Sequence, residues 1–337
     1  MPRRILLAAV LFWPSSGWGN SGLVAPRSGP LPPIAVQGAA RVALSEPLLG
    51  LLAPAATELP APPAIGALRV QADLPAPALA APGQETAGAA LQATETGLIG
   101  VADIDGALAA LGAASYPLGE SERALIAGLA ERYPALPIAA DRLFLVREPR
   151  LLARLGIPED AGGAARILTD GRREVQVILL SAVSPVPLDD FVEFAIHEAV
   201  HLADDGILRV PHGEEALHWL AEGYTQLRSH PLANGALAGL GRPARSGWQA
   251  YSDEIALVQA VIARHGREPL EALVTRGDAG GLASALGPRW RFMRVLAARR
   301  ADGTRPPRAR FLAAFKAIVE ATAWGPDERA AVLAYLY

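Results

Sequence analysis

The chain contains no cysteine among its 337 residues, although it is long enough for one large domain or two smaller ones. The lack of thiols excludes disulfide frameworks, thiolate nucleophiles, cysteine-ligated zinc and iron–sulfur centres. A metal site would have to use histidine and carboxylate ligands. Histidine is also scarce, and every candidate comes from a short set: His197, His201, His212, His218, His230 and His265.

An excess of charge of one sign is missing as well. Only 19% of the residues are charged, and the formal net charge is -3 at pH 7. Such a chain has no overall attraction for nucleic acid or acidic lipid. We interpret one arginine cluster as a solvated face, because the total charge is not basic: Arg299, Arg300, Arg305, Arg308 and Arg310. We expect no nucleic-acid partner.

Long hydrophobic runs are absent too, and the N-terminal run is too short to span a membrane. Basic residues precede an apolar stretch over residues 5–13, and a Gly-Trp-Gly triplet follows at 17–19. This order is typical of a secretory signal peptide cleaved after Gly19. The alternative is a disordered N-terminus that happens to contain a hydrophobic stretch. We expect residues 1–19 to be a signal peptide, a secreted or periplasmic location, and no stable membrane insertion.

Proline, by contrast, is abundant between residues 20 and 100, together with alanine and glycine. Prolines at this density interrupt both helical and strand periodicity. We expect residues 20–100 to be a disordered linker or a pro-segment, and the composition does not choose between them. The folded domain is expected over residues 101–337.

The patterns of this domain predict an α+β fold. Helices are expected at 105–114 and at 121–132, the second with Ser121 as N-cap, and a short one at 151–155. A strand is expected at 142–147, and a hairpin at 165–169 and 174–180 around Asp-Gly-Arg. Gly280-Gly281 is typical of a turn. Helices are expected after Pro187 at 189–204, 214–229, 252–265, 269–274, 288–300, 308–323 and 327–337.

An HExxH pattern occupies residues 197–201, inside one of these predicted helices. Four residues make about one helical turn, so His197 and His201 lie on one face, where both imidazoles can bind one ion. Glu198 lies about 100° around the helix. There its carboxylate is placed to take a proton from metal-bound water. The alternative is an exposed helix face that carries two histidines and a glutamate by coincidence.

A catalytic zinc site needs a third protein ligand. The segment WLAEG at residues 219–223 offers Glu222 on the next predicted helix. Gly223 costs about 1 kcal/mol relative to alanine inside a helix, which close helix packing at a metal site would explain. The alternative for Glu222 is a solvated carboxylate.

With both segments, the chain resembles the gluzincin branch of the zincin metallopeptidases over residues 143–273, and WLAEG is especially similar to the aminopeptidase-type members. The resemblance implies a zincin-like fold: a small antiparallel or mixed sheet, then a mainly helical part. It also implies Zn²⁺ held by His197, His201 and Glu222, with Glu198 as catalytic base. Similar enzymes place a tyrosine on a downstream helix to stabilise the oxyanion, and Tyr251 is the candidate, with a half-buried structural aromatic as the alternative.

The sequence also departs from these relatives. Residues 174–180 contain no Gly-x-Met-Glu-Asn segment, and Ala221 stands where the relatives have asparagine. The substrate class is thus not defined beyond a peptide bond. Around the site, Asp204, Asp205 and Glu254 are candidates to orient a ligand histidine, or else they face water.

We therefore expect an exported zinc metallopeptidase acting on a peptide or protein substrate, with exo- or endo-cleavage open. Two alternatives remain. One is a secreted helical binding protein with a structural or vestigial zinc site, in which His218 or Asp204 would complete a closed set of four ligands. The other is a zinc hydrolase acting on a non-peptide amide.

Overall fold

The computed structural model describes residues 92–93, 97–155, 157, 161–182, 186–210, 215–245, 251–300 and 308–336. These residues fall within one compact unit. The expected signal peptide over residues 1–19 and most of the expected linker over 20–100 lie outside the described residues. No helix in the described part combines the length and the apolar composition of a membrane span.

A six-stranded mixed sheet comes first along the chain, in the order β1-β2-β5-β6-β4-β3. The strands β4, β5 and β6 confirm the predicted ones, whereas the short β1, β2 and β3 were not predicted. Strands β1 and β2 lie within the stretch expected to be a disordered linker, so the sheet begins before Val101, at residue 92. The strand bounds are β1 Gln92–Ala93, β2 Leu98–Gly100, β3 Ser115–Tyr116, β4 Leu143–Val146, β5 Gly163–Thr169 and β6 Glu174–Ser181.

The hairpin of β5 and β6 is the centre of this sheet, and its antiparallel register runs from Gly163 opposite Leu180 to Thr169 opposite Glu174. In its turn, the Asp170 carboxylate accepts hydrogen bonds from two backbone amides at 2.8 and 2.7 Å. Gly171 has φ +82, a conformation that favours glycine. The Asp-Gly-Arg turn that the sequence predicts therefore closes the hairpin.

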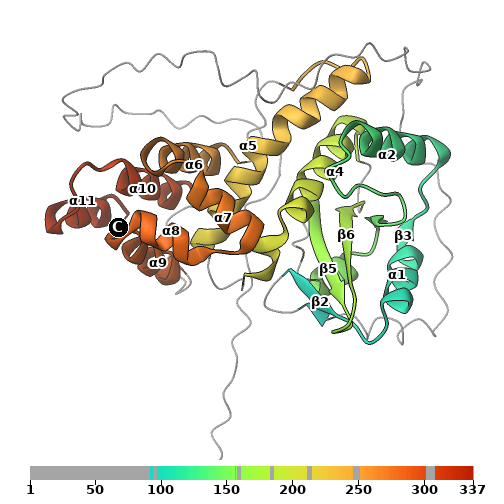
Figure 1. Cartoon of the computed structure of the whole chain (residues 1–337), viewed down its shortest axis with the longest axis horizontal. Coiled ribbons are helices and arrows are strands. Elements are labelled where there is room, and N and C mark those ends of the chain that lie inside the picture. Colours follow the sequence, from blue (N-terminus) through green and yellow to red (C-terminus); the bar gives the residue numbers. More distant parts are fainter. Residues whose placement is uncertain are drawn as a thin grey trace, which may run out of the picture. The chain divides into compact units, whose positions relative to one another are not determined.

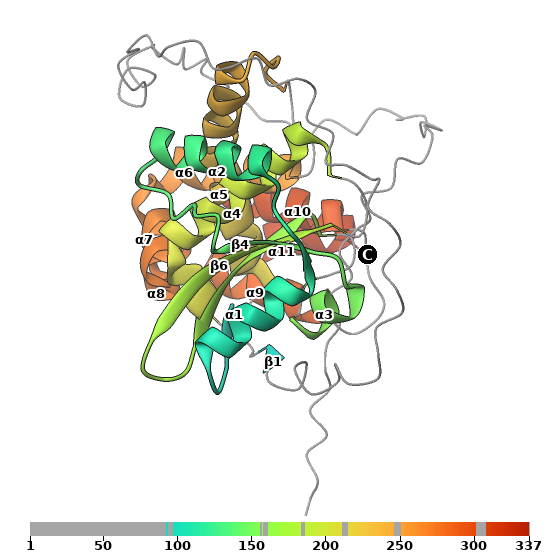
Figure 2. The same cartoon turned by 90° about the vertical axis from the view of Figure 1, so that its right-hand side faces the viewer.

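Helices cover both faces of the sheet (Figures 1 and 2). Successive side chains of a strand point to opposite faces. Val177 and Leu179 accordingly pack with α1 (Ile104–Ala113) and α3 (Pro149–Arg154), whereas Ile178 and Leu180 pack with α2 (Glu120–Arg132) and α4 (Leu188–Ala203). The helix that carries the HExxH pattern is therefore fixed by apolar contacts to the sheet.

The rest of the described chain is helical, which confirms the α+β expectation (Figure 1). Its core surrounds Trp219, which packs against Phe311 and Phe315 at ring-centroid distances of 6.5 and 5.6 Å. The helices are α5 Glu215–Gly239, α6 Ser252–His265, α7 Glu268–Arg276, α8 Ala279–Leu286, α9 Pro288–Arg300, α10 Arg308–Glu320 and α11 Pro326–Leu336.

Several local predictions were wrong. Helix α2 begins at Glu120 with Gly119 as N-cap, so Ser121 lies inside its first turn. Gly280-Gly281 is not a turn but lies within α8, because the Asp278 side chain caps that helix by accepting from the Gly281 amide at 2.9 Å. The predicted end of α5 at residue 229 was also too early.

Helix α5 continues through Pro231 to Gly239. Proline inside a helix removes one backbone hydrogen bond and is normally unfavourable. Beyond it, Ala233, Ala236 and Leu237 are buried in the same core as α4 and the sheet. These apolar contacts offset the break, which is why local sequence signals gave too short a helix.

The turn that follows α4 makes a close backbone contact with the end of α7. Gly206 lies in the 3-10 turn Asp205–Arg209 that follows α4. A Cβ atom added to Gly206 would lie 2.3 Å from the Gly277 nitrogen and 2.4 Å from the Arg276 nitrogen. Because backbone atoms cannot move aside as a flexible side chain can, only glycine fits there.

This contact predicts that Gly206→Ala lowers the free energy of unfolding by about 3 kcal/mol through overpacking. Gly128→Ala is the matched control, because Gly128 is exposed in α2 and a Cβ there meets nothing within 4 Å. The control should gain about 0.5–1 kcal/mol from helix propensity. Denaturant unfolding measures both, and equal stability of Gly206→Ala and the parent would contradict the contact.

Candidate metal centre

Helix α4 brings the two histidines of the HExxH pattern together. It starts after Pro187 with two aspartates in its first turn, where the helix dipole favours them, and it is buried along its last turns. The side chains of His197 and His201 are only 4% and 6% exposed. Their Nε2 atoms lie 3.2 Å apart, as expected for positions i and i+4 on one face.

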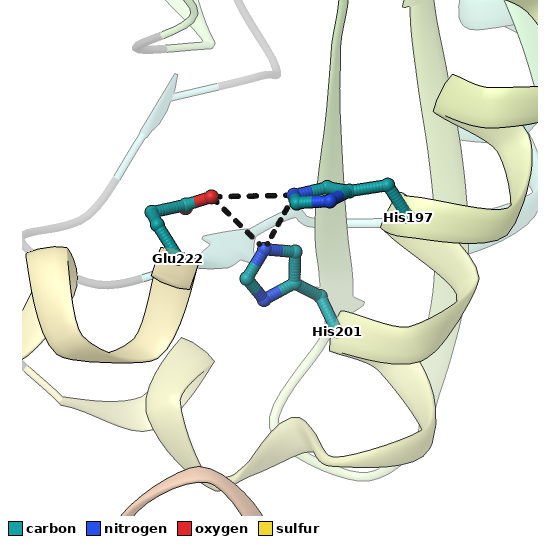
Figure 3. Close-up of side chains that lie close together, drawn as sticks. All are labelled: His197, His201 and Glu222. Atoms are coloured by element: carbon teal, nitrogen blue, oxygen red, sulfur yellow. Dashed lines mark hydrogen bonds and ion pairs between the residues drawn. The ribbon is translucent and has the colours of Figure 1, made fainter. Parts of the chain in front are cut away.

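Helix α5 supplies the third group (Figure 3). The Oε2 atom of Glu222 lies 3.2 Å from Nε2 of His197 and 3.4 Å from Nε2 of His201. The three side chains thus form a triangle of potential ligand atoms. Their proximity, which the sequence predicted, is confirmed, and the group could hold a metal ion.

Gly223 explains how α5 reaches this position. A Cβ atom on Gly223 would lie 2.5 Å from the backbone oxygen of Glu254 and 2.6 Å from its carbonyl carbon. Glycine therefore allows α5 to lie directly against α6 at the residue that follows Glu222. The expected close helix packing is confirmed.

The electrostatics of the triangle favour an ionised carboxylate. Burial would raise the pKa of Glu222, but the neighbouring imidazoles, His201 foremost, hold it well below its usual range. Burial lowers the pKa of His201, whereas the Glu222 carboxylate raises it, and the net pKa is raised. Three lone-pair-bearing atoms in mutual contact repel one another unless a proton or a cation lies between them.

The outer ring nitrogens contact neutral side chains from α5. The Gln226 amide oxygen lies 2.8 Å from Nδ1 of His197, and Ser229 Oγ lies 3.4 Å from the same atom. Thr225 Oγ1 lies 3.3 Å from Nδ1 of His201. An oxygen acceptor at Nδ1 keeps the proton there, so that the Nε2 lone pair of His197 faces the centre.

Sequence reasoning missed these partners. A signal was present, because residues 222, 225, 226 and 229 share one face of a helix. Once Glu222 points at the histidines, Thr225 and Gln226 must lie near the same rings.

The acidic candidates for this role have other partners. Asp204 is buried and forms an ion pair with Arg228. Asp205 pairs with Arg209 at 2.9 Å. Glu254, 2% exposed, neither faces water nor contacts a histidine but pairs with Arg308. Its pairing also shows that Arg308 is not part of a solvated face.

Glu198 lies beside the centre on the sheet side of α4. It is 8% exposed, and its carboxylate forms no hydrogen bond or ion pair within the described residues. A Cβ atom on Gly163 would lie 3.3 Å from Glu198 Cγ, so the first residue of β5 approaches it closely. A carboxylate without a fixed partner is able to exchange protons with a water or a ligand.

Tyr251, the N-cap residue of α6, stacks on His197. The two ring centroids are 5.5 Å apart, and the ring planes differ by 5°. Burial raises the pKa of Tyr251 well above its usual range, and the carboxylates of Glu222 and Glu198 raise it further. The phenol therefore remains protonated at neutral pH and can act as a hydrogen-bond donor.

Comparisons of the chain with protein-family models, with curated proteins and with solved structures give no match.

The Gln226 contact generates a prediction about metal affinity. Gln226→Leu should weaken binding of a divalent metal about 10–100-fold, because outer partners orient ligand histidines and fix their tautomer. Gln226→Glu keeps an acceptor oxygen and should retain tight binding. Competition with a chromophoric chelator measures both, and unchanged affinity of Gln226→Leu would show that the contact has no orienting role.

Proposed function

We propose that the chain is an exported zinc-dependent metallopeptidase of the gluzincin type, which hydrolyses peptide bonds by attack of water. One observation carries the proposal. Glu222 Oε2 lies within 3.2–3.4 Å of both histidine Nε2 atoms, although it comes from a different helix. The Glu198 carboxylate lies beside this triangle, has no ion-pair or hydrogen-bond partner among the described residues, and provides the second element that such a reaction needs.

The donor set suits zinc. Imidazole nitrogen and carboxylate oxygen are its usual ligands besides thiolate, at bond lengths of about 2.0–2.2 Å. In a tetrahedral site, these bond lengths place neighbouring donor atoms about 3.3–3.6 Å apart. The separations of 3.2, 3.2 and 3.4 Å in the triangle lie close to this value. Cations such as calcium and magnesium prefer all-oxygen sites.

When bound, zinc would polarise the scissile carbonyl and make a bound water more acidic. The reaction then depends on the protein's proton donors and acceptors. Glu198 accepts the proton of the attacking water and delivers it to the departing amine. Tyr251, which stays protonated, donates a hydrogen bond to the developing oxyanion.

An extended substrate is proposed to lie along β5. Within the described residues, β2 pairs only with positions 167–169 of β5, whereas β6 pairs with the whole strand. The half of β5 that begins at Gly163, next to Glu198, has one edge that no described strand pairs, and on it the Ala165 carbonyl oxygen accepts a hydrogen bond from the Arg166 side chain at 2.8 Å. Backbone pairing at such an edge is a recurring mode of peptide recognition and supports a peptide substrate.

The geometry favours the enzyme over a binding protein with a structural zinc site. A structural site needs four protein ligands. In the part of the chain that the structure describes, the group has three members, and neither His218 nor Asp204 belongs to it. A non-peptide amide substrate remains the second candidate for the reaction, and substrate profiling separates the two.

Two variants test the proposal. Glu198→Gln should retain zinc and lower kcat about 10²–10⁴-fold, because only the proton acceptor is lost. His201→Ala should lose both zinc and activity. Elemental analysis and a broad peptide library, with and without a chelator, provide the measurements.

Glu320→Gln serves as the matched control, because this exposed glutamate of α10 pairs with Lys316 and has no part in the centre. It should behave as the parent. Full activity of Glu198→Gln would disprove the mechanism, and a parent without bound metal would disprove the function.

A further inference from the structure

Helices α5, α6 and α10 meet close to the metal centre at Arg308, the first residue of α10. The Arg308 guanidinium forms an ion pair with Glu254 of α6. Its central carbon also lies 5.9 Å from the ring centroid of Trp219 on α5. Arg308 therefore binds both helices that carry site residues, by an ion pair on one side and a cation–π contact on the other.

Both contacted residues lie within one helical turn of the centre. Glu254 is three residues after Tyr251, and Trp219 is three residues before Glu222. The backbone of Glu254 is also the surface against which Gly223 packs. A shift of α6 relative to α5 at this point would move the Tyr251 ring and the Glu222 carboxylate relative to the two histidines.

The ion pair is largely shielded from water. The Glu254 side chain is 3% exposed and that of Arg308 is 20% exposed. A buried carboxylate without its partner is strongly destabilised, so removal of Arg308 would favour a shift of α6.

We infer that Arg308 is a positioning residue of the metal centre, which holds Glu222 and Tyr251 in place through Trp219 and Glu254. The inference rests on the proposed function for its effect on hydrolysis. It also has a consequence without hydrolysis, because the placement of Glu222 sets the affinity for a divalent cation.

The test compares variants of the full chain at the two ends of α10. Arg308→Met removes both contacts, and Arg308→Lys keeps the charge beside Glu254. Arg289→Met is the matched control, because Arg289 donates to the backbone oxygens of Ile318 and Ala321 near the other end of α10, away from the centre. If Arg308→Met does not fold, Glu254→Gln/Arg308→Met removes both charges and takes its place.

Three readouts follow at a temperature where every variant is folded. Zinc affinity should fall about 10-fold in Arg308→Met, be partly restored in Arg308→Lys, and stay unchanged in Arg289→Met. The ring-current shift of the His197 protons caused by Tyr251, seen by NMR of the metal-free protein, should shrink only in the Arg308 variants. The fall in kcat should be smaller in a Tyr251→Phe background, since residues acting through one another are not additive.

The outcomes separate the two proposals. Parent-like zinc affinity and His197 shifts in Arg308→Met would overturn the positioning role, and so would equal losses in Arg289→Met. A parent that binds zinc but hydrolyses nothing would overturn the proposed function alone, while affinity and NMR still decide the role of Arg308.

Discussion

The centre depends on the convergence of three ligand atoms that the rest of the fold must hold in place. Two imidazole nitrogens and a carboxylate oxygen point at one another at 3.2–3.4 Å, where their lone pairs repel one another unless a proton or a cation lies between them. Such convergence is maintained only because α4 is packed on the sheet and α5 is packed on α6 at Gly223. A cation at this point would turn the repulsion into binding energy.

The two halves of the molecule contribute different things to this centre. The sheet side fixes α4 and brings β5 against Glu198, which places the histidines and the carboxylate that could move protons. The helical side fixes Glu222, its neutral neighbours Thr225 and Gln226, and the Tyr251 ring. Neither half carries a complete set of ligands.

The sequence predicted those features that depend on short separations along the chain. The i, i+4 histidines, the Asp-Gly turn of the hairpin and most helices belong to this class. Features set by distant contacts were missed: the strands β1 to β3, the length of α5 beyond Pro231, and the pairing of Glu254 with Arg308. The roles given to Asp204 and Glu254 failed for the same reason, because the arginines that neutralise them come from other helices.

Helix α5 belongs to two hydrophobic cores at once. Around Trp219 it lies in the core of the helical part, and from Ala233 onward it lies in the core of α4 and the sheet. Division of the chain on either side of this helix would leave an apolar surface bare on one fragment, which favours aggregation over folding. The region from the sheet to α10 should therefore fold as one unit rather than as two separable parts.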